Sequence, residues 1–329
     1  MSEAKFVVKK ITKLEDLIED PNASIPESDI TFQTKDSIIQ LDLQNEDGPK
    51  EKYVIKSGVY IFESTSSGLV LAPIELRRNK MLETVSATED ILKEGNKFFD
   101  RLDVYKKRSL IPKRSVLLMS APGIGKTAAI NLTCHKYREK DENTCVIVWN
   151  TAGIRSRDVL DFFMADAEYE ENVSKMIMVM EDIGGGSVDE FDGPRGVDAS
   201  MLNLLDGVGN PFQNIPTFII ATTNHPEQVA EALIDRPGRF DKCLELQPPT
   251  TTESIELYKF FLECELDDKT LRAAEIASKN KFSIAHISES IVRSELDGTT
   301  ILEAVESLVE HKKKFKKAFS KARGMGLND

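Results

Sequence analysis

One segment, residues 115–127, restricts the fold of this chain more than any other. An apolar run from Ser115 to Met119 leads directly into SAPGIGKT, which spans Ser120 to Thr127. This octet matches the phosphate-loop pattern GxxxxGK[ST], except that Ser120 stands at the first glycine position. The two glycines allow successive backbone N–H groups to face phosphate oxygens, and the following helix adds the positive end of its dipole. The segment therefore predicts a strand, a phosphate-binding loop and a helix of an α/β sheet.

The chemistry of such a loop assigns roles to its last two residues. Lys126 would reach the β- and γ-phosphates, and the hydroxyl of Thr127 would hold Mg²⁺. The alternative is an ordinary glycine turn, and Ser120 weakens the match because a side chain restricts the backbone there. The strand before the loop and the helix after it favour nucleotide binding. The predicted nucleotide-binding residues are Ser120, Ala121, Pro122, Gly123, Ile124, Gly125, Lys126, Thr127 and Ala128.

Two further apolar runs end in polar side chains. Met176 to Met180 precedes Glu181 and Asp182, and Phe218 to Thr223 precedes Asn224. Buried strands that end in carboxylates or an amide can supply a Mg²⁺ partner, a water-activating base and a water-orienting group. Taken singly, each is also compatible with a polar turn after a strand. Their order after the phosphate loop makes the catalytic interpretation the stronger one.

A fourth motif contains two arginines on a tight turn. The segment Arg236 to Asp241 reads RPGRFD. Arg236 and Arg239 are either solvated surface charges or fingers that stabilise charge on a γ-phosphate.

Composition limits the environment in which the chain can work. Acidic residues outnumber basic ones, 55 to 43, and the net charge of −12 argues against a protein coated by nucleic acid. The four scattered cysteines form no CxxC pair, so we expect neither a zinc site nor a disulfide framework. No apolar run approaches the roughly 20 residues that a membrane span needs, and the N-terminus is too charged for a signal peptide. We therefore expect a cytoplasmic protein without a membrane partner.

The pattern along the chain predicts three domains. Residues 1–85 contain alternating apolar positions and turn signals, so we expect a β-rich N-terminal domain. Residues 86–248 alternate between strand-like and helix-like segments, as a parallel α/β sheet requires. Residues 249–329 contain only helical patterns after Pro248-Pro249 and are expected to form a helical lid.

Together these motifs resemble the AAA ATPases, a family of P-loop NTPases. Ala232 to Asp241 is similar to the family's second region of homology, and LNLLDG at Leu202 to Gly207 resembles its preceding segment. Phe282 to Ile287 resembles the helical-lid signature, with His286 where an acidic residue is usual. The resemblance implies ATP and Mg²⁺ as ligands. It also implies a ring of identical subunits, expected to be a hexamer.

The resemblance also implies a role for each matching residue. Glu181 would join Thr127 in holding the metal, Asp182 would be the base and Asn224 the first sensor. Arg236 and Arg239 would reach the nucleotide of a neighbouring subunit. The family usually has Asp before Glu, and this chain reverses the order. The same reversal occurs in the AAA chaperone of the mitochondrial inner membrane that translocates the Rieske protein, so activity is compatible with it, and either carboxylate could be the base.

Two segments carry less decisive signals. Alignment on Asp158 places Phe163 and Met164 in the family's substrate-gripping pore loop, although packing of Phe162 and Phe163 on a helix explains them as well. The basic C-terminal stretch from Lys312 to Arg323 is either a solvated helix face, which we favour, or a surface for anionic partners.

The leading function is ATP hydrolysis that drives remodelling or unfolding of a protein substrate. Two alternatives remain at this point: a motor or loader on nucleic acid, and a module that binds ATP with little turnover. Fold analogy alone does not choose the substrate.

Overall fold

A computed structural model describes residues 30–34, 37–42, 50–65, 68–76, 88–151, 153–184, 199–226, 229 and 238–325. The chain divides into two compact units. The first comprises Met1–Arg77, Leu92–Leu117 and Thr133–Cys243, and the second comprises Arg78–Ile91, Leu118–Leu132 and Leu244–Asp329. In the described part of the chain, no helix has the length and apolar character to cross a membrane.

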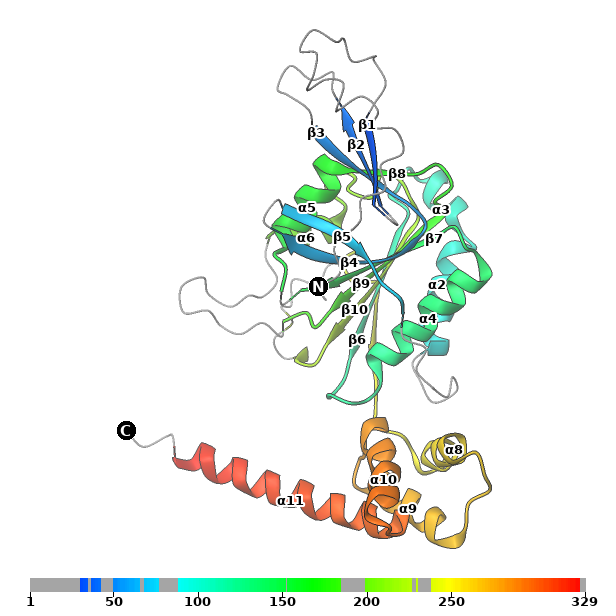
Figure 1. Cartoon of the computed structure of the whole chain (residues 1–329), viewed down its shortest axis with the longest axis vertical. Helices are drawn as coiled ribbons and strands as arrows, with labels where there is room; N and C mark the ends of the chain where they lie inside the picture. Colours follow the sequence, from blue (N-terminus) through cyan, green and yellow to red (C-terminus); the bar gives the residue numbers. More distant parts are fainter. Residues whose placement is uncertain are drawn as a thin grey trace, which may run out of the picture. The chain divides into compact units, whose positions relative to one another are not determined.

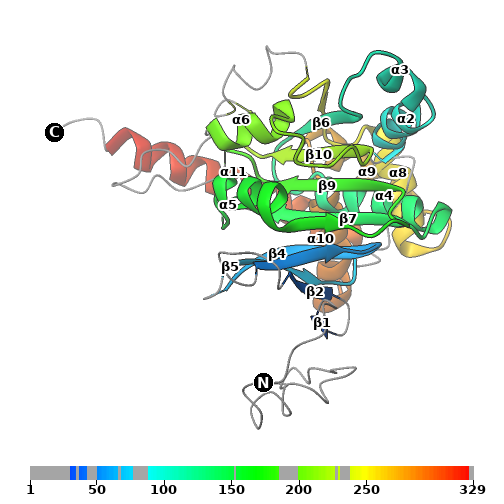
Figure 2. The same ribbon diagram turned by 90° about the horizontal axis from the view of Figure 1, so that it is seen from above.

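A seven-stranded sheet has the order β11-β6-β10-β9-β7-β4-β5, and most of its residues belong to the first unit. The strands are β4 (Gly58–Thr65), β5 (Gly68–Pro73), β6 (Lys113–Met119), β7 (Thr144–Asn150), β9 (Lys175–Glu181), β10 (Thr217–Thr223) and β11 (Lys242–Glu245). Strand β9 pairs in parallel with both β7 and β10, and Figure 2 shows it between them. Every residue of β10 is buried, as expected for a parallel strand covered on both faces. The P-loop α/β fold predicted from the sequence is confirmed.

Helices cover both faces of this sheet in the first unit (Figure 1). The elements are α2 (Thr88–Phe99), α3 (Leu102–Lys107), α4 (Lys126–Lys140), α5 (Ser156–Asp161), the π-helix η2 (Phe162–Asp166) and α6 (Ala199–Asp206). On one face, Phe99 contacts Tyr137 of α4 and Phe218 of β10. On the other, Phe62 of β4 meets Phe163 of η2 edge to face at 5.7 Å between ring centroids. Aromatic packing therefore attaches helices to each face.

The strands near the N-terminus belong to two different sheets. Strands β1 (Ile30–Thr34), β2 (Ser37–Asp42) and β3 (Lys50–Ile55) form a small sheet with β8 (Ala167–Tyr169). Strand β4 instead pairs in parallel with β7, and β5 completes the edge of the main sheet. Strands β4 and β5 pair antiparallel, with Thr65 opposite Gly68. The structure thus divides the β-rich residues of the expected 1–85 domain, because β4 and β5 extend the α/β sheet.

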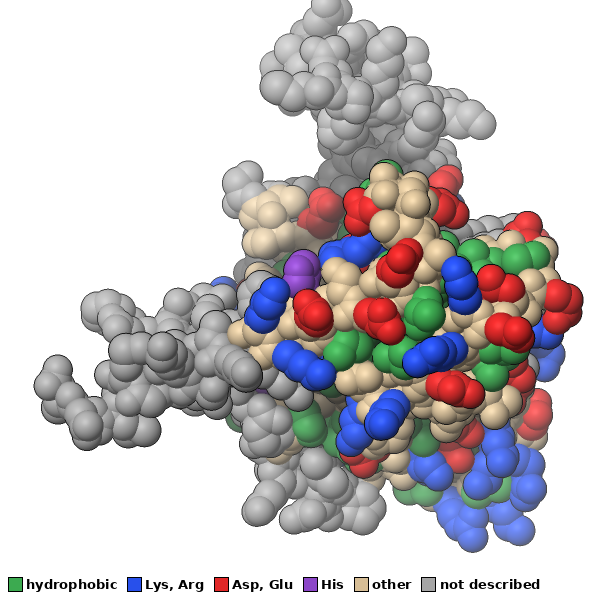
Figure 3. All heavy atoms as spheres, turned by 90° about the horizontal axis from the view of Figure 1, so that it is seen from below, with side chains coloured by type: hydrophobic (Ala, Val, Ile, Leu, Met, Phe, Trp, Pro, Cys, Tyr) green, Lys and Arg blue, Asp and Glu red, His purple; other side chains and the backbone are tan. Residues whose placement is uncertain are grey.

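The helices of the second unit bury their own apolar core. They are α8 (Thr251–Leu262), α9 (Asp268–Lys279), α10 (Ile284–Asp297) and α11 (Ile301–Met325). Leu257, Ala277, Phe282, Ile287 and Val305 are among the buried residues of this core. Thr250 and Glu253 form a capping box that starts α8 directly after Pro248-Pro249. Figure 3 shows acidic and basic side chains interspersed on the face viewed from below.

Candidate active site

The phosphate loop lies between β6 and α4, and its glycines adopt backbone conformations that L side chains rarely reach. Gly123 has φ +81° and Gly125 has φ +99°. Ser120 is not among the described residues with positive φ. A serine at this position therefore causes no strain from a left-handed backbone conformation. The departure from the usual pattern is compatible with the loop.

Lys126 begins α4 and is held by the residue that departs from the pattern. Its Nζ donates to the carbonyl oxygen of Ser120 at 3.0 Å and to the Ser120 hydroxyl at 2.8 Å. The side chain is buried, with 8% of its surface exposed, whereas Thr127 is exposed at the start of the helix. Ser120 thus gives the ammonium group two acceptors. Sequence reasoning placed Ser120 in the loop as a departure from the motif but did not foresee these two hydrogen bonds.

The beginning of α10 contacts the phosphate loop within the second unit. The N–H of Ala285 donates to the carbonyl of Gly123 at 3.2 Å, and a Cβ built on Gly123 would lie 2.9 Å from the Ser283 hydroxyl. Ser283 is the N-cap of α10, and its hydroxyl accepts from the N–H of His286. The lid signature identified in the sequence therefore lies directly on the loop, a role that the motif alone did not assign.

His286 completes this cap in place of an acidic residue. Its Nδ1 accepts from the Ser283 N–H at 3.3 Å and lies 2.6 Å from the Ser283 hydroxyl. An Nδ1 that accepts these bonds carries no proton. Burial, together with the charge of Lys312, lowers the pKa of His286 below its usual range. The cap thus requires the neutral imidazole.

In the first unit, the structure brings Asp182 and Asn224 together at the carboxyl ends of neighbouring strands. The Asn224 Nδ2 donates to Asp182 Oδ1 at 3.0 Å. The parallel pairing of β9 and β10 brings these strand ends side by side, with Met180 opposite Ala221. The first-sensor residue predicted from sequence therefore touches the second carboxylate of the acidic pair.

Glu181 occupies a different environment from its neighbour. Burial, followed by the charge of Asp182, raises the pKa of the Glu181 carboxyl. A divalent cation beside Glu181 would stabilise its charged form, which burial and the charge of Asp182 disfavour. This carboxylate therefore fits the predicted metal role. The described residues contain no group of three or more His, Cys, Asp and Glu arranged for a metal ion. Mg²⁺ in nucleotide sites needs only one or two carboxylates besides the phosphates, so the lack of such a group among the described residues is compatible with the predicted metal role of Glu181.

Arg239 is buried in its own chain. Its guanidinium donates from Nε to Asp206 Oδ1 and from Nη2 to Asp206 Oδ2, each at 3.0 Å. Its backbone is also anchored, because the Ser115 hydroxyl donates to the Arg239 carbonyl and the Ser115 N–H donates to Asp241 at 2.8 Å. Sequence reasoning did not foresee the contact with Asp206, which lies in the LNLLDG segment. Arg236 lies outside the described residues.

The structure separates the two residues predicted for the pore loop. Phe163 is 1% exposed and packs edge to face against Phe62 and Phe212, so the packing interpretation of this residue is the correct one. A side chain enclosed in this way cannot grip a substrate. Met164 is 48% exposed and lies against Gly209.

The side chains of the basic C-terminal stretch lie mostly outside the described residues. In the basic C-terminal stretch, side chains are described only up to residue 314, and Lys312 donates to the carbonyls of Asn280 and Lys281. Lys312 thus caps the end of α9.

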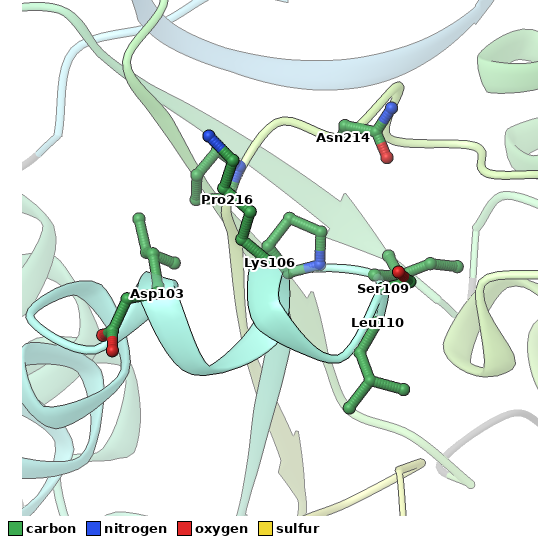
Figure 4. A pocket seen from close by; sticks show the side chains of 9 residues that line it. Asp103, Lys106, Ser109, Leu110, Asn214 and Pro216 are labelled. Carbon is green, nitrogen blue, oxygen red and sulfur yellow. The ribbon is translucent and has the colours of Figure 1, made fainter.

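A cavity of about 560 Å³ lies at the opposite end of β10 from Asn224 (Figure 4). Its walls come from α3 and from the segments before β6 and β10, and they combine apolar side chains such as Leu110 with Lys106 and Asn214. Thr217 begins β10 at this end, whereas Thr223 precedes Asn224 at the other. This cavity is therefore separate from the acidic pair and its amide.

Comparison with known proteins agrees with the resemblance inferred from the motifs. Residues 116–248 match the "ATPase family associated with various cellular activities (AAA)". The chain is 26% identical to the "ATPase family gene 2 protein" of Schizosaccharomyces pombe, over 59% of this chain and 24% of that protein. It is 28% identical to the "Probable mitochondrial chaperone bcs1" of the same organism, over 56% and 40% of the two chains. Identity to the "Proteasome-activating nucleotidase" of Thermococcus onnurineus is 30%, over 48% and 40%. The matched part is less than half of each of these relatives.

Proposed function

We propose that this chain, whose residues 116–248 match the AAA ATPase family, hydrolyses ATP with Mg²⁺ and uses the energy to remodel a protein substrate. ATP would bind at Ser120 to Ala128, where Lys126 and the N-terminus of α4 stabilise its phosphates. The observation that carries the assignment of roles is the bond from Asn224 to Asp182. It links the sensing amide to one carboxylate of the acidic pair.

This bond favours Asp182 as the base. An attacking water must lose its proton to a carboxylate that is held in a defined direction, and Asn224 provides that restraint. Burial and the charge of Asp182 raise the pKa of Glu181, so a nearby cation would stabilise the charged form of this carboxylate. A bound Mg²⁺ would neutralise charge on the phosphate oxygens.

The test compares Asp182→Asn with Glu181→Gln in the full chain. Asp182→Asn should bind ATP normally and hydrolyse it at least ~100-fold more slowly, which is the typical contribution of a positioned base. Glu181→Gln should instead weaken the Mg²⁺ dependence of ATP binding, measured by calorimetry with and without the metal. The two roles would have to be reversed if Asp182→Asn turned over ATP normally while Glu181→Gln bound ATP but did not hydrolyse it.

We also propose that the active form is a ring of identical subunits, a hexamer, in the cytoplasm. The family resemblance supports the ring, in which Arg236 and Arg239 would reach a neighbour's nucleotide. Relatives named as a chaperone and as a proteasome-activating nucleotidase support a protein substrate.

Mixed assemblies test the ring. Arg239→Ala has an intact phosphate loop and base, and Lys126→Ala has an intact arginine segment. Neither alone should hydrolyse ATP, and a mixture with proven subunit exchange should regain activity. A strictly monomeric enzyme whose specific activity does not depend on protein concentration, yet falls in Arg239→Ala, would refute the ring. An Asp182→Asn chain loaded with ATP, used as a trap, would identify the substrate.

A further inference from the structure

The reversed acidic pair makes the catalytic carboxylate unusually dependent on its backbone. Aspartate is one methylene shorter than the glutamate that the family usually has at this position, so its reach is smaller. Asp182 also has φ +58°, a left-handed conformation that is uncommon for a residue with a Cβ. Such a conformation persists only where neighbouring groups hold it. The contacts of this backbone therefore decide where the carboxylate lies.

Hydrogen bonds from the two flanking strand ends restrain both peptide groups that adjoin the Asp182 Cα. At the end of β7, the Thr151 hydroxyl lies 2.8 Å from the Glu181 carbonyl and 3.1 Å from the Asp182 carbonyl. At the end of β10, the Thr222 hydroxyl accepts from the Asp182 N–H at 3.0 Å. The Thr222 carbonyl accepts from the N–H of Ile183 at 2.7 Å.

Thr151 is the residue whose side chain reaches both sides of the turn. The Glu181 carbonyl belongs to the peptide before the Asp182 Cα, and the Asp182 carbonyl belongs to the peptide after it. A single hydroxyl that bonds to both restricts the φ and ψ of Asp182 together. The backbone N–H of Thr151 adds only one long bond, to the Glu181 carbonyl at 3.3 Å. The second peptide therefore depends on the hydroxyl for its contact with β7.

We propose that Thr151 is a positioning residue that sets the direction of the Asp182 carboxylate through the backbone of the acidic turn. Asn224 then restrains the carboxylate itself. Backbone restraint from Thr151 and side-chain restraint from Asn224 together replace the longer reach of a glutamate. This inference rests on the proposed role of Asp182 as the base.

The experiment removes only the hydroxyl. Thr151→Val keeps the shape of the side chain, and its kcat for ATP should fall about 10- to 100-fold, since small displacements of a catalytic group have effects of this size. The KM for ATP and the ATP affinity should stay unchanged. Thr151→Ser restores a hydroxyl and should recover most of the rate. Thr217→Val is the matched control, because its hydroxyl also donates to a backbone carbonyl, that of Ile215 at 2.8 Å, at the other end of β10.

A double variant separates positioning from a general loss of structure. In Asp182→Asn the base is absent, so adding Thr151→Val should cause no further loss of rate. A folded Thr151→Val with wild-type kcat would overturn the inference, as would an equal extra loss in the Asp182→Asn background. If Thr151→Val does not fold, Thr151→Ala replaces it with the same readouts. Full activity of Asp182→Asn would instead refute the proposed base. That outcome differs from the ones that would overturn the role of Thr151.

Discussion

The guanidinium of Arg239 forms a two-point ion pair with the carboxylate of Asp206 in the same chain, with both N–O distances at 3.0 Å. Planar pairs of this kind are among the stronger charge-assisted hydrogen bonds. The Arg239 side chain is 8% exposed, so the pair is shielded from water. For Arg239 to act on the nucleotide of a neighbouring subunit, this pair would have to open.

The first prediction concerns the stability of this pair. Arg239→Ala and Asp206→Ala should each lower the melting temperature clearly, because each leaves a shielded charge without its partner. The double variant should lose less than the sum of the two single losses. Arg155→Ala is the control, since its pair with Asp158 is exposed and should contribute little. Additive losses at Arg239 and Asp206 would show that the pair does not couple them.

The second prediction concerns the phosphate loop. Lys126→Ala should abolish ATP binding in calorimetry, because Lys126 is the only cation in residues 120–127. Ser120→Gly should keep ATP binding, since the carbonyl of residue 120 remains available to Lys126 and glycine is the family's residue there. Unchanged ATP affinity in Lys126→Ala would contradict the assignment of the loop.

The third prediction is a pH dependence in the lid. Burial lowers the folded-state pKa of His286, so below its ordinary value of 6.5 the unfolded chain binds more protons than the folded chain. Stability should therefore be fully present above that pH and decrease as the pH falls through the folded pKa. Protonation also removes the acceptor of the Ser283 cap. Melting temperatures between pH 8 and pH 5 measure the effect.

His286→Asp is the matched variant for this experiment. An aspartate at this position can accept the same bonds and places negative charge at the start of a helix, which is favourable. It should flatten the dependence over this interval. An equally steep loss of stability in His286→Asp would assign the pH dependence to other groups.

The fourth prediction separates Phe163 from Met164. Phe163→Ala should cost roughly 3–5 kcal/mol of unfolding free energy, the usual range for truncating a buried phenylalanine. Met164→Ala should leave the stability nearly unchanged, because its side chain is largely exposed. Chemical denaturation of both variants gives the comparison. A small effect of Phe163→Ala would show that the ring is less tightly packed than the structure indicates.

Local sequence was sufficient for several features whose physics is local. The glycines that need positive φ and the apolar runs of β9 and β10 can each be identified from a few consecutive residues. Their order then predicted the parallel sheet and the helical lid. The placement of Ser120 in the loop was predicted as well, although its bonds to Lys126 were not.

Contacts between distant segments required the tertiary structure. Whether Phe163 is exposed depends on Phe62 and Phe212, which lie far from it in the chain, and periodicity does not reveal them. The same holds for Arg239 and Asp206, and for the division of the N-terminal strands between two sheets. The sequence by itself determined which groups are candidates for the chemistry, since those groups are set by residue type and spacing. Only the tertiary structure decided which of them meet: Asp182 with Asn224, Thr151 with the acidic turn, and Ser283 with Gly123, because each contact depends on how separate elements pack.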